Sequence, residues 1–249
     1  MINSNQPIRI AIAGLGFGEK VHIPASLSNQ NIELVGLWHP RPDRLKEACN
    51  KHHLCAYETW KDLVNDPKIE GIIIATPPAH RFELALEAIK AGKHLLLEKP
   101  ACLNSYEVIE LQRNGLKRNL KIAVDYEYRA VPLFMQAKRI INEKKLDEPY
   151  FVKLDWLMSS RANPDRPWNW YSDEDSGGGV LGALGTHAFD MIHWLIGPTH
   201  SLSAINSTSI KERECPLSKT IKKVTSEDVS ISQLQIKSIN NNLIPVQVN

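Results

Sequence analysis

The sequence predicts an α/β protein, with a doubly wound parallel sheet followed by an α+β domain on an open, mostly antiparallel sheet. Three observations lead to this fold class. Short apolar runs alternate with amphipathic segments along residues 1–125, glycines directly follow the first apolar run, and strand-like segments follow one another late in residues 126–249. We therefore expect two domains, residues 1–125 and 126–249.

Strands of the first domain are expected where an apolar run is stopped by glycine, proline or polar residues. Residues 71–75 are the clearest case, because isoleucines fill most of the run and two prolines follow it closely. The expected strands are residues 8–13, 33–38, 71–75, 93–97 and 121–124.

Helices are expected between these strands. Phe82, Leu86 and Ile89 recur at helical spacing, and Gly92 follows them as a stop signal. Asn104 is expected to cap a helix that runs to about residue 118. The expected helices are residues 21–28, 42–52, 59–64, 81–90 and 105–118. Strands that alternate with helices in this way predict right-handed crossovers and a parallel sheet.

The pattern changes after about residue 126. A polar segment rich in Trp, Pro and Asp leads to a glycine triplet at residues 177–179, and the last elements are strands without helices between them. The elements expected here are helices 131–142 and 186–196 and strands 150–156, 229–236 and 243–248. Consecutive strands predict an antiparallel or mixed sheet, and hence a second domain.

Composition excludes several classes of protein. Hydrophobic residues make up 43% of the chain and charged residues 23%, which is typical of a globular protein, and the formal net charge is only +2. This balance gives no electrostatic basis for binding nucleic acid or a membrane surface. We see no transmembrane segment or signal peptide, and four scattered cysteines favour a reducing, cytoplasmic setting.

The glycine-rich turn after the first strand predicts a nucleotide site. Gly14, Gly16, Phe17 and Gly18 stand between an expected strand and an expected helix, where backbone N–H groups can hold a pyrophosphate. The third glycine comes one residue earlier than in the usual dinucleotide fingerprint. Glycine also marks other sharp strand-to-helix turns, so the local alternative is a turn without a ligand.

The end of the second strand bears on the choice of cofactor. Arg41 offers a guanidinium for a 2′-phosphate, His39 can assist it, and we expect no carboxylate there to repel the phosphate. Glu33 lies at the start of the strand, where it is expected to face solvent. We therefore predict NADP, with NAD as the alternative; Arg41 could also be a surface residue that flanks a helix.

Several motifs together resemble the glucose–fructose oxidoreductase/inositol dehydrogenase/MocA (Gfo/Idh/MocA) family. The Glu-Lys-Pro triplet and the glycine triplet that leads to Gly-Thr-His are the most specific. The matching segments are the glycine turn with residues 21–24, then residues 75–80, 98–100, 177–181 and 185–190. The resemblance covers nearly the whole chain.

The resemblance implies a Rossmann domain, a C-terminal domain whose open sheet forms a homo-oligomer interface, and NAD(P)-dependent oxidation or reduction of a small molecule. The expected substrate is a secondary alcohol or carbonyl of a sugar, polyol or cyclitol-like compound. By the same resemblance Lys99 lies beside the nicotinamide and the substrate hydroxyl, and His187 is the acid/base. Cofactor-lining positions implied in the same way are Thr76, Pro77, His80 and Glu98.

These roles agree with the chemistry of the reaction. Hydride leaves a carbinol carbon only as the O–H proton is lost, so the site needs a base with a pKa near neutrality, and histidine is the natural choice. A lysine ammonium beside the oxygen stabilises the developing alkoxide. We therefore predict that His187 and Lys99 are the catalytic residues.

The sequence departs from the family pattern in two places. Ala183 stands four residues before His187, where the family has an aspartate. The chain also stops at Asn249 within an expected strand although family members continue, so the sheet of the second domain is expected to be incomplete. Oxidoreductase activity is therefore in doubt. The alternatives are a nucleotide-binding regulatory or interaction protein on the same scaffold, or a shortened remnant that does not fold fully.

Three further residues are candidates for binding substrate. Trp168 and Tyr171 could form an apolar wall for a sugar ring, or could simply pin a long loop. Asp190 lies one helical turn after His187 and could hydrogen-bond it or only add charge near the helix start. Arg129 resembles a family arginine near the domain junction and is expected to be structural.

No metal site is predicted. Cys49, His52, His53 and Cys55 lie close together in the sequence, but they run off the end of a helix, where their side chains point in different directions. His193 lies off the helix face that carries His187, so we do not expect the two histidines and an aspartate to form a His-Asp-His metal triad.

Overall fold

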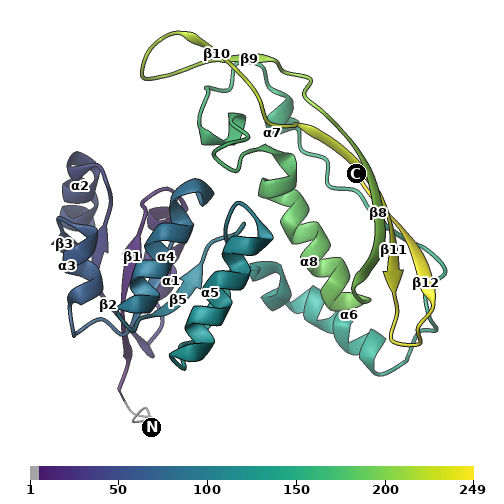
Figure 1. The fold of residues 1–249 in the computed structure, drawn as a ribbon, viewed down its shortest axis with the longest axis horizontal. Coiled ribbons are helices and arrows are strands. Elements are labelled where there is room, and N and C mark those ends of the chain that lie inside the picture. Colours follow the sequence, from purple (N-terminus) through teal and green to yellow (C-terminus); the bar gives the residue numbers. More distant parts are fainter. Residues whose placement is uncertain (1–5) are drawn as a thin grey trace. The chain divides into compact units, whose positions relative to one another are not determined.

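The computed structural model describes residues 6–249, and only the backbone of residues 160 and 161. The chain divides into two compact units, one ending at Asp125 and the other comprising Tyr126–Asn249 (Figure 1). We describe each unit by itself.

In residues 6–125, a six-stranded sheet has the order β3-β2-β1-β4-β5-β6, and all of its neighbouring strands are parallel. The strands are β1 (Ile8–Ala13), β2 (Ile32–Trp38), β3 (Cys55–Tyr57), β4 (Gly71–Ile74), β5 (His94–Leu97) and β6 (Ile122–Val124). The order reverses direction between β1 and β4, as in doubly wound sheets, where ligands bind outside the carboxyl ends of the strands. The predicted parallel sheet is confirmed; β3 is a strand that the sequence analysis did not predict.

The helices of this unit agree closely with the predicted segments. Thr59 and Asn104 cap α3 and α5, because their side chains accept hydrogen bonds from the backbone N–H groups of Asp62 and Glu107. A π-helical turn precedes α1, so the helical segment begins earlier than predicted. The helices are η1 (Gly18–His22), α1 (Ile23–Leu27), α2 (Pro42–His52), α3 (Trp60–Asn65), η2 (Pro78–His80), α4 (Arg81–Lys90) and α5 (Ser105–Lys117).

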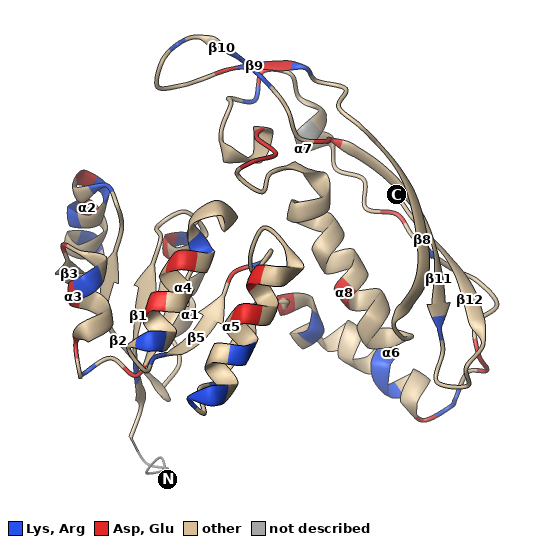
Figure 2. Cartoon of the chain, viewed as in Figure 1, with Lys and Arg blue, Asp and Glu red and all other residues tan. Residues whose placement is uncertain are grey.

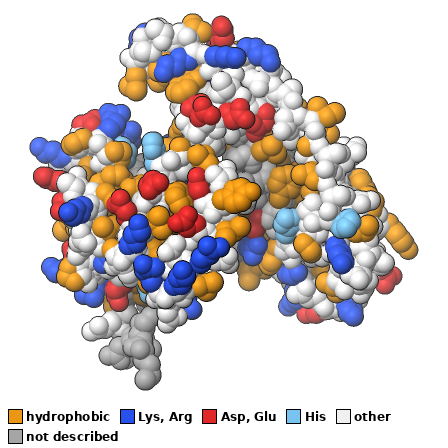
Figure 3. Space-filling model, viewed as in Figure 1, with side chains coloured by type: hydrophobic (Ala, Val, Ile, Leu, Met, Phe, Trp, Pro, Cys, Tyr) orange, Lys and Arg blue, Asp and Glu red, His pale blue; other side chains and the backbone are white. Residues whose placement is uncertain are grey.

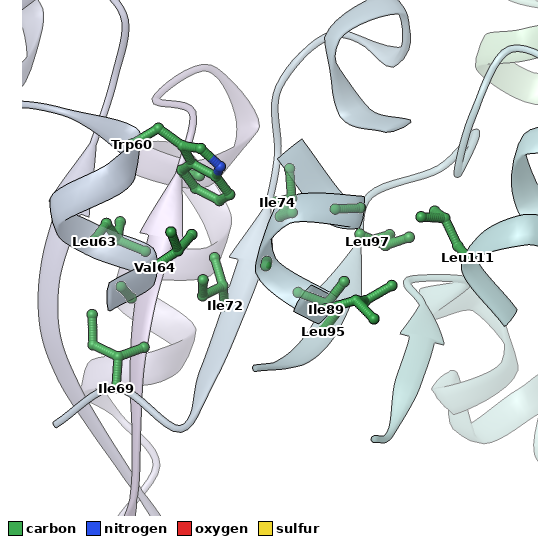
Figure 4. Close-up of a cluster of buried hydrophobic side chains, with 14 of the residues drawn as sticks. Trp60, Leu63, Val64, Ile69, Ile72, Ile74, Ile89, Leu95, Leu97 and Leu111 are labelled. Carbon is green, nitrogen blue, oxygen red and sulfur yellow. The ribbon is translucent and has the colours of Figure 1, made fainter. Parts of the chain in front are cut away.

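The two faces of this sheet belong to separate buried clusters. Ile72 and Ile74 point to one cluster and Ile73 to the other, because successive side chains of a strand point to opposite faces. In the first cluster, β4 and β5 pack against side chains of α3, α4 and α5 (Figure 4). Burial on both faces holds the carboxyl ends of the central strands in fixed positions.

In residues 126–249, a four-stranded sheet has the order β7-β12-β11-β8, and a separate hairpin joins β9 to β10. The strands are β7 (Val152–Leu154), β8 (Thr199–Ser207), β9 (Glu212–Glu214), β10 (Ile221–Lys223), β11 (Val229–Lys237) and β12 (Leu243–Val248). The β8–β11 and β11–β12 pairs are antiparallel and β12–β7 is parallel, so the predicted mostly antiparallel sheet is confirmed.

Helix α8 (Thr186–Leu195) lies against one face of this sheet (Figure 1). Its Ala188 and Ile192 side chains pack with Leu234 and Ile236 of β11 and with Val246 of β12. The other helical elements of the unit are η3 (Glu127–Ala130), α6 (Pro132–Asn142), α7 (Ser159–Ala162), η4 (Trp170–Ser172) and the π-helical η5 (Leu181–Gly185). The strand predicted at 150–156 is shorter than expected, and β8, β9 and β10 were not predicted.

Charges of both signs are mixed on the surface of the first unit. Helices α4 and α5 each carry both acidic and basic side chains (Figure 2), and the face drawn in Figure 3 has the same mixture. Among the residues that the structure describes, no helix combines the length and apolar character needed to cross a membrane.

Replacing Leu97 with Ala should lower the free energy of unfolding by about 2–5 kcal/mol, because the side chain is 1% exposed and its removal leaves a cavity. Denaturation of the full chain, followed by circular dichroism, measures the change. Leu116→Ala is the control, because Leu116 is 73% exposed on α5 and its loss should cost little. Equal effects of the two substitutions would contradict the assignment of the core.

Candidate functional site

The glycine turn follows β1 and is held against the end of β4. Gly14 has φ +96°, and a Cβ atom placed on it would lie 2.7 Å from the carbonyl carbon of Ala75 and 2.8 Å from the nitrogen of Thr76. Its own N–H donates to the carbonyl of Trp38 at 3.0 Å. This position therefore requires glycine, both for its left-handed conformation and for the close approach of two backbones.

The next two glycines differ in their surroundings. A Cβ atom on Gly16 would meet no atom within 4 Å, so the backbone of the turn faces open space there. A Cβ atom on Gly18 would lie 3.2 Å from the side chain of Ile12, which explains the small residue at the start of η1. Phe17 between them is exposed, with its ring edge-on to His22. A turn open at Gly16 leaves room for a phosphate to approach its backbone, which fits a dinucleotide.

The end of β4 supplies a second observation that fits a ligand. The hydroxyl of Thr76 is buried and has no hydrogen-bond partner among the described residues, although buried polar groups are normally paired. Pro77 is half-buried and His80 is exposed in the same segment. The buried guanidinium of Arg81 donates to the carbonyls of Thr76, Glu98 and Pro100, and so ties this segment to the end of β5.

The end of β5 is held by a buried cluster of charged side chains. Glu98 accepts a hydrogen bond from His22 Nε2 through Oε1 at 2.9 Å, and another from the backbone N–H of Lys99 through Oε2 at 3.1 Å. Asp125 Oδ2 lies 3.8 Å from the same His22 nitrogen. His22 is 5% exposed and Glu98 7%. These contacts hold in place the segment that contains the predicted cofactor-lining Glu98 and the predicted catalytic Lys99.

Sequence reasoning gave no role to His22 or Asp125. His22 belongs to a motif segment of the family resemblance, but its partner Glu98 lies 76 residues away along the chain. His22, Glu98 and Asp125 offer ligand atoms within 4.8 Å of one another, a spacing that could hold a metal ion. In this structure His22 and Glu98 are hydrogen-bonded directly to each other.

The ionisation of Asp125 is shifted by this environment. Burial raises the pKa of the Asp125 carboxyl, and the nearby Glu98 carboxylate raises it further. His22 and Lys99 lie close enough to oppose the rise in the pKa of Asp125. The Asp125 carboxylate is therefore costly to form here, and its nearest cations reduce that cost.

The end of β2 differs from what the sequence analysis expected. Arg41 Nη2 forms an ion pair with Asp43 Oδ2 at 2.6 Å, and both side chains are exposed. The expectation that no carboxylate stands at this strand end is therefore wrong: Asp43, in the first turn of α2, brings one to the guanidinium. His39 Nδ1 accepts a hydrogen bond from the Arg41 N–H at 3.1 Å, and burial lowers the pKa of His39.

In the second unit, His187 lies near the start of α8 among aromatic rings. It is 3% exposed, and the ring centroids of Tyr128, Tyr126 and Trp156 lie 4.9, 5.9 and 6.0 Å from its own. Its Nε2 is 3.6 Å from a carboxylate oxygen of Glu127. A buried imidazole with a carboxylate nearby is a common arrangement for general acid/base catalysis.

Asp190, the residue one turn after His187, is held by Arg129. Its two oxygens accept hydrogen bonds from Arg129 Nε at 2.8 Å and Nη2 at 2.5 Å. This two-point contact fixes the planes of both groups. Arg129 therefore holds in place a residue that the sequence analysis predicted to bind substrate.

Trp168 and Tyr171 both contact other residues of the second unit. Trp168 donates from Nε1 to the carbonyl of Lys223 at 3.1 Å, and Lys222 Nζ lies 4.5 Å from the centre of its ring. The ring of Tyr171 stacks on that of Trp170 at 3.7 Å. The contacts of Trp168 attach the long loop to the β9–β10 hairpin, whereas the stack of Tyr171 on Trp170 lies within the loop.

The cysteines and histidines of residues 49–55 contact different partners. His52 Nε2 lies 3.4 Å from Glu19, and Cys49 Sγ donates to the carbonyl of Cys55 at 3.5 Å. His53 ends α2 in the left-handed conformation with φ 56°.

A doubly wound sheet with an open glycine turn at its carboxyl edge is the arrangement found in dinucleotide-binding proteins. Comparison with protein families agrees. The oxidoreductase family with an NAD-binding Rossmann fold matches residues 8–126, and the GFO/IDH/MocA C-terminal domain matches residues 134–239. The chain belongs to the Gfo/Idh/MocA oxidoreductase family.

Individual relatives agree with this assignment. An uncharacterized oxidoreductase of Synechocystis is 38% identical over 244 residues, which cover 97% of this chain and 65% of that protein. Levoglucosan dehydrogenase of Pseudarthrobacter phenanthrenivorans is 32% identical over 155 residues, or 62% of this chain and 40% of the enzyme. A structure of levoglucosan dehydrogenase with NADH and levoglucosan has a TM-score of 0.85 at 26% identity, covering 98% of this chain and 67% of that one. The chain thus spans less than two thirds of the length of these two curated relatives.

Replacing Asp125 with Asn should stabilise the protein more at pH 7 than at pH 4. The pKa of Asp125 is higher in the folded state than its unfolded value of about 3.9, so its contribution to stability falls as the pH rises above that value. Asparagine does not ionise and escapes this loss. The difference in Tm between variant and wild type should grow by about 2–4 °C from pH 4 to pH 7.

Asp66→Asn is the control with the opposite sign. A hydrogen bond from the Tyr57 hydroxyl lowers the pKa of Asp66, so this carboxylate stabilises the fold above its unfolded pKa and less in acid. This substitution should therefore cost more at pH 7 than at pH 4. The same pH trend in both variants would contradict the burial argument for Asp125.

Proposed function

We propose that the protein is an NAD(P)-dependent oxidoreductase that transfers hydride between a nicotinamide cofactor and a secondary alcohol or carbonyl. The observation that carries this proposal is the juxtaposition of the open glycine turn with the buried ends of β4 and β5, which bear Thr76 and the Glu98-Lys99-Pro100 segment. Ligands of doubly wound sheets bind at this edge.

The residues proposed to hold the cofactor come from several strand ends. The backbone of the turn at Gly14, Gly16, Phe17 and Gly18 would receive the pyrophosphate. The segment after β4 and the end of β5 would line the remainder of the molecule, through Thr76, Pro77, His80, Glu98 and Lys99. The nicotinamide supplies the hydride chemistry when it is bound.

The proton is proposed to move at His187 Nε2 or Nδ1. The aromatic rings of Tyr126, Tyr128 and Trp156 around His187 exclude water from its faces, so the imidazole can exchange a proton with the substrate hydroxyl rather than with solvent. Lys99 is proposed to donate a hydrogen bond to the same substrate oxygen and to stabilise its negative charge as the proton leaves.

The substrate proposed is a sugar, polyol or cyclitol-like compound. Support comes from the names of relatives, which include levoglucosan dehydrogenase, inositol 2-dehydrogenase and glucose-6-phosphate 3-dehydrogenase. Trp168, Tyr171 and Asp190 remain proposed substrate-binding residues; the guanidinium of Arg129 orients Asp190 for such a contact.

For the cofactor we propose NADP(H), with NAD(H) as the alternative. Arg41 and His39 lie together after β2, and the guanidinium is exposed and available to exchange its Asp43 partner for a 2′-phosphate. That exchange costs the existing ion pair, so the preference for NADP(H) should be modest.

We also propose that residues 126–249 form a homo-oligomer through the open face of their sheet. Ile205 and Ile231 are paired opposite each other on β8 and β11 and lie 73% and 44% exposed. Exposed β-branched residues on a sheet face favour association with a second sheet.

A regulatory protein that binds the cofactor without turnover is the second candidate. The observation that favours it is Ala183, a buried residue of η5 that offers no carboxylate near His187. Binding of a pyridine nucleotide without turnover of any sugar or polyol would support this candidate over the enzyme.

Substitution of the proposed catalytic residues should slow turnover strongly. With a panel of sugars and polyols, Lys99→Ala should lower kcat/KM by about 10²–10³-fold, and His187→Gln by about 10²–10⁴-fold, because each removes one partner of the substrate oxygen. Absorbance of the reduced nicotinamide gives the rate. Lys90→Ala, an exposed position on α4, is the control and should leave the rate unchanged. Wild-type rates in Lys99→Ala would refute its role.

Cofactor preference can be measured by titrating the protein with NADPH and NADH separately. Arg41→Ala should weaken NADPH binding by about tenfold, the loss of one hydrogen bond to a charged group, and leave NADH unchanged. Asp43→Asn should strengthen NADPH binding, because Arg41 no longer has to leave an ion pair. Tighter binding of NADH than of NADPH by the wild type would overturn the proposed preference.

A further inference from the structure

We infer that His22, Glu98 and Asp125 form a positioning cluster that sets the placement of Lys99 and couples it to the glycine turn. None of the three is proposed to touch the substrate. The inference rests on the proposed function, because it concerns how the proposed catalytic lysine is held.

The cluster joins three elements at the carboxyl edge of the sheet. His22 is the last residue of η1, the π-helical turn that begins at Gly18. Glu98 follows β5, and Asp125 follows β6, where its N–H donates to the carbonyl of Leu97 at 2.8 Å. The elements that carry the glycine turn and Lys99 are therefore connected by side chains and not only by the sheet.

The backbone around Lys99 is held on both sides of the residue. Glu98 Oε2 accepts the hydrogen bond from the Lys99 N–H, while its Oε1 accepts from His22 Nε2. Arg81 donates to the carbonyl before Lys99 and to the one after it, those of Glu98 and Pro100. Rotation of the Glu98 side chain would break both of its hydrogen bonds, so His22 fixes the carboxylate that holds the Lys99 amide.

The charges of the cluster also act on the lysine side chain. The Lys99 charge is close enough to Asp125 to affect its ionisation, and the Glu98 carboxylate acts on the same group. An ammonium group within electrostatic range of a carboxylate is attracted toward it, more strongly in a partly buried site than in water. His22 thus acts on the backbone of Lys99 through Glu98, and Asp125 acts on its charge.

The π-helical turn links the glycine turn to His22. Interruptions of this kind are rare and occur often at functional sites. Because His22 ends the turn that starts at the third glycine, a shift of the glycine turn on binding a ligand would move His22 relative to Glu98. A merely structural role for His22 would instead affect the whole nucleotide site equally.

Two variants of His22 separate these roles. His22→Leu removes the hydrogen-bond donor, whereas His22→Gln keeps an N–H donor at a similar reach and should restore the wild-type behaviour. His52→Gln is the matched control, because His52 also lies near a glutamate, Glu19, in the same unit. Asp125→Asn is added because it changes charge with little change in shape, which keeps the test valid if His22→Leu does not fold.

The first readout needs no cofactor. Full-length protein is treated briefly with acetic anhydride at pH 8, and modification of each lysine is measured by mass spectrometry. We expect the rate at Lys99 to change by about threefold or more in His22→Leu and Asp125→Asn, with His22→Gln and His52→Gln like the wild type. Rates at the exposed Lys90 and Lys117 are internal references. An unchanged rate at Lys99 in His22→Leu and Asp125→Asn would overturn the inference.

The second readout separates the two ends of the cofactor. Dissociation constants are measured for NADPH, for NADH and for ADP-ribose, which lacks the nicotinamide. His22→Leu should weaken the tighter dinucleotide by about tenfold and leave ADP-ribose nearly unchanged, because only the nicotinamide end lies near Lys99. Equal weakening of all three would show a structural role and overturn the inference. A wild type that binds no dinucleotide would refute the proposed function, and the labelling result would then decide the inference alone.

Discussion

The buried guanidinium of Arg81 connects the strand ends on which the candidate site is built. It donates to the carbonyls of Thr76, Glu98 and Pro100, where two extended segments leave the sheet after β4 and β5. Glu98, His22 and Asp125 continue this network toward β6 and the glycine turn. A chain that leaves a parallel sheet must satisfy its backbone groups in some other way, and here it does so with charged side chains that also surround the proposed catalytic lysine.

The second unit buries the imidazole of His187. An imidazole inside a helix-and-sheet core is costly unless its polar atoms have partners, and here aromatic rings cover its faces while Glu127 approaches its Nε2. Asp190, one turn further along α8, is oriented by Arg129. Both units thus hold their candidate residues with buried or two-point polar contacts, which is the arrangement that a reaction site requires.

Much of the first unit could be predicted from sequence because its signals are local. The bounds of β1, α2 and α4 agree with the predicted segments, and Asn104 caps α5 as expected. Strands β3 and β8 were missed, since β3 is short and β8 is exposed on both faces, so neither has the alternation that marks a half-buried strand. Asp43 was overlooked at the end of β2, because a residue in the first turn of a helix was not considered as a partner of Arg41.

The sequence by itself determined the class of fold, the need for glycine after β1 and the family, because hydrophobic periodicity and backbone conformation depend on residues close together in the chain. Only the tertiary structure decided which charged groups meet. His22 and Glu98 are 76 residues apart, and Arg129 and Asp190 are 61 apart, so their contacts depend on how strands and helices pack. Packing of the whole sheet brings such groups within hydrogen-bond distance, and no local pattern encodes that distance.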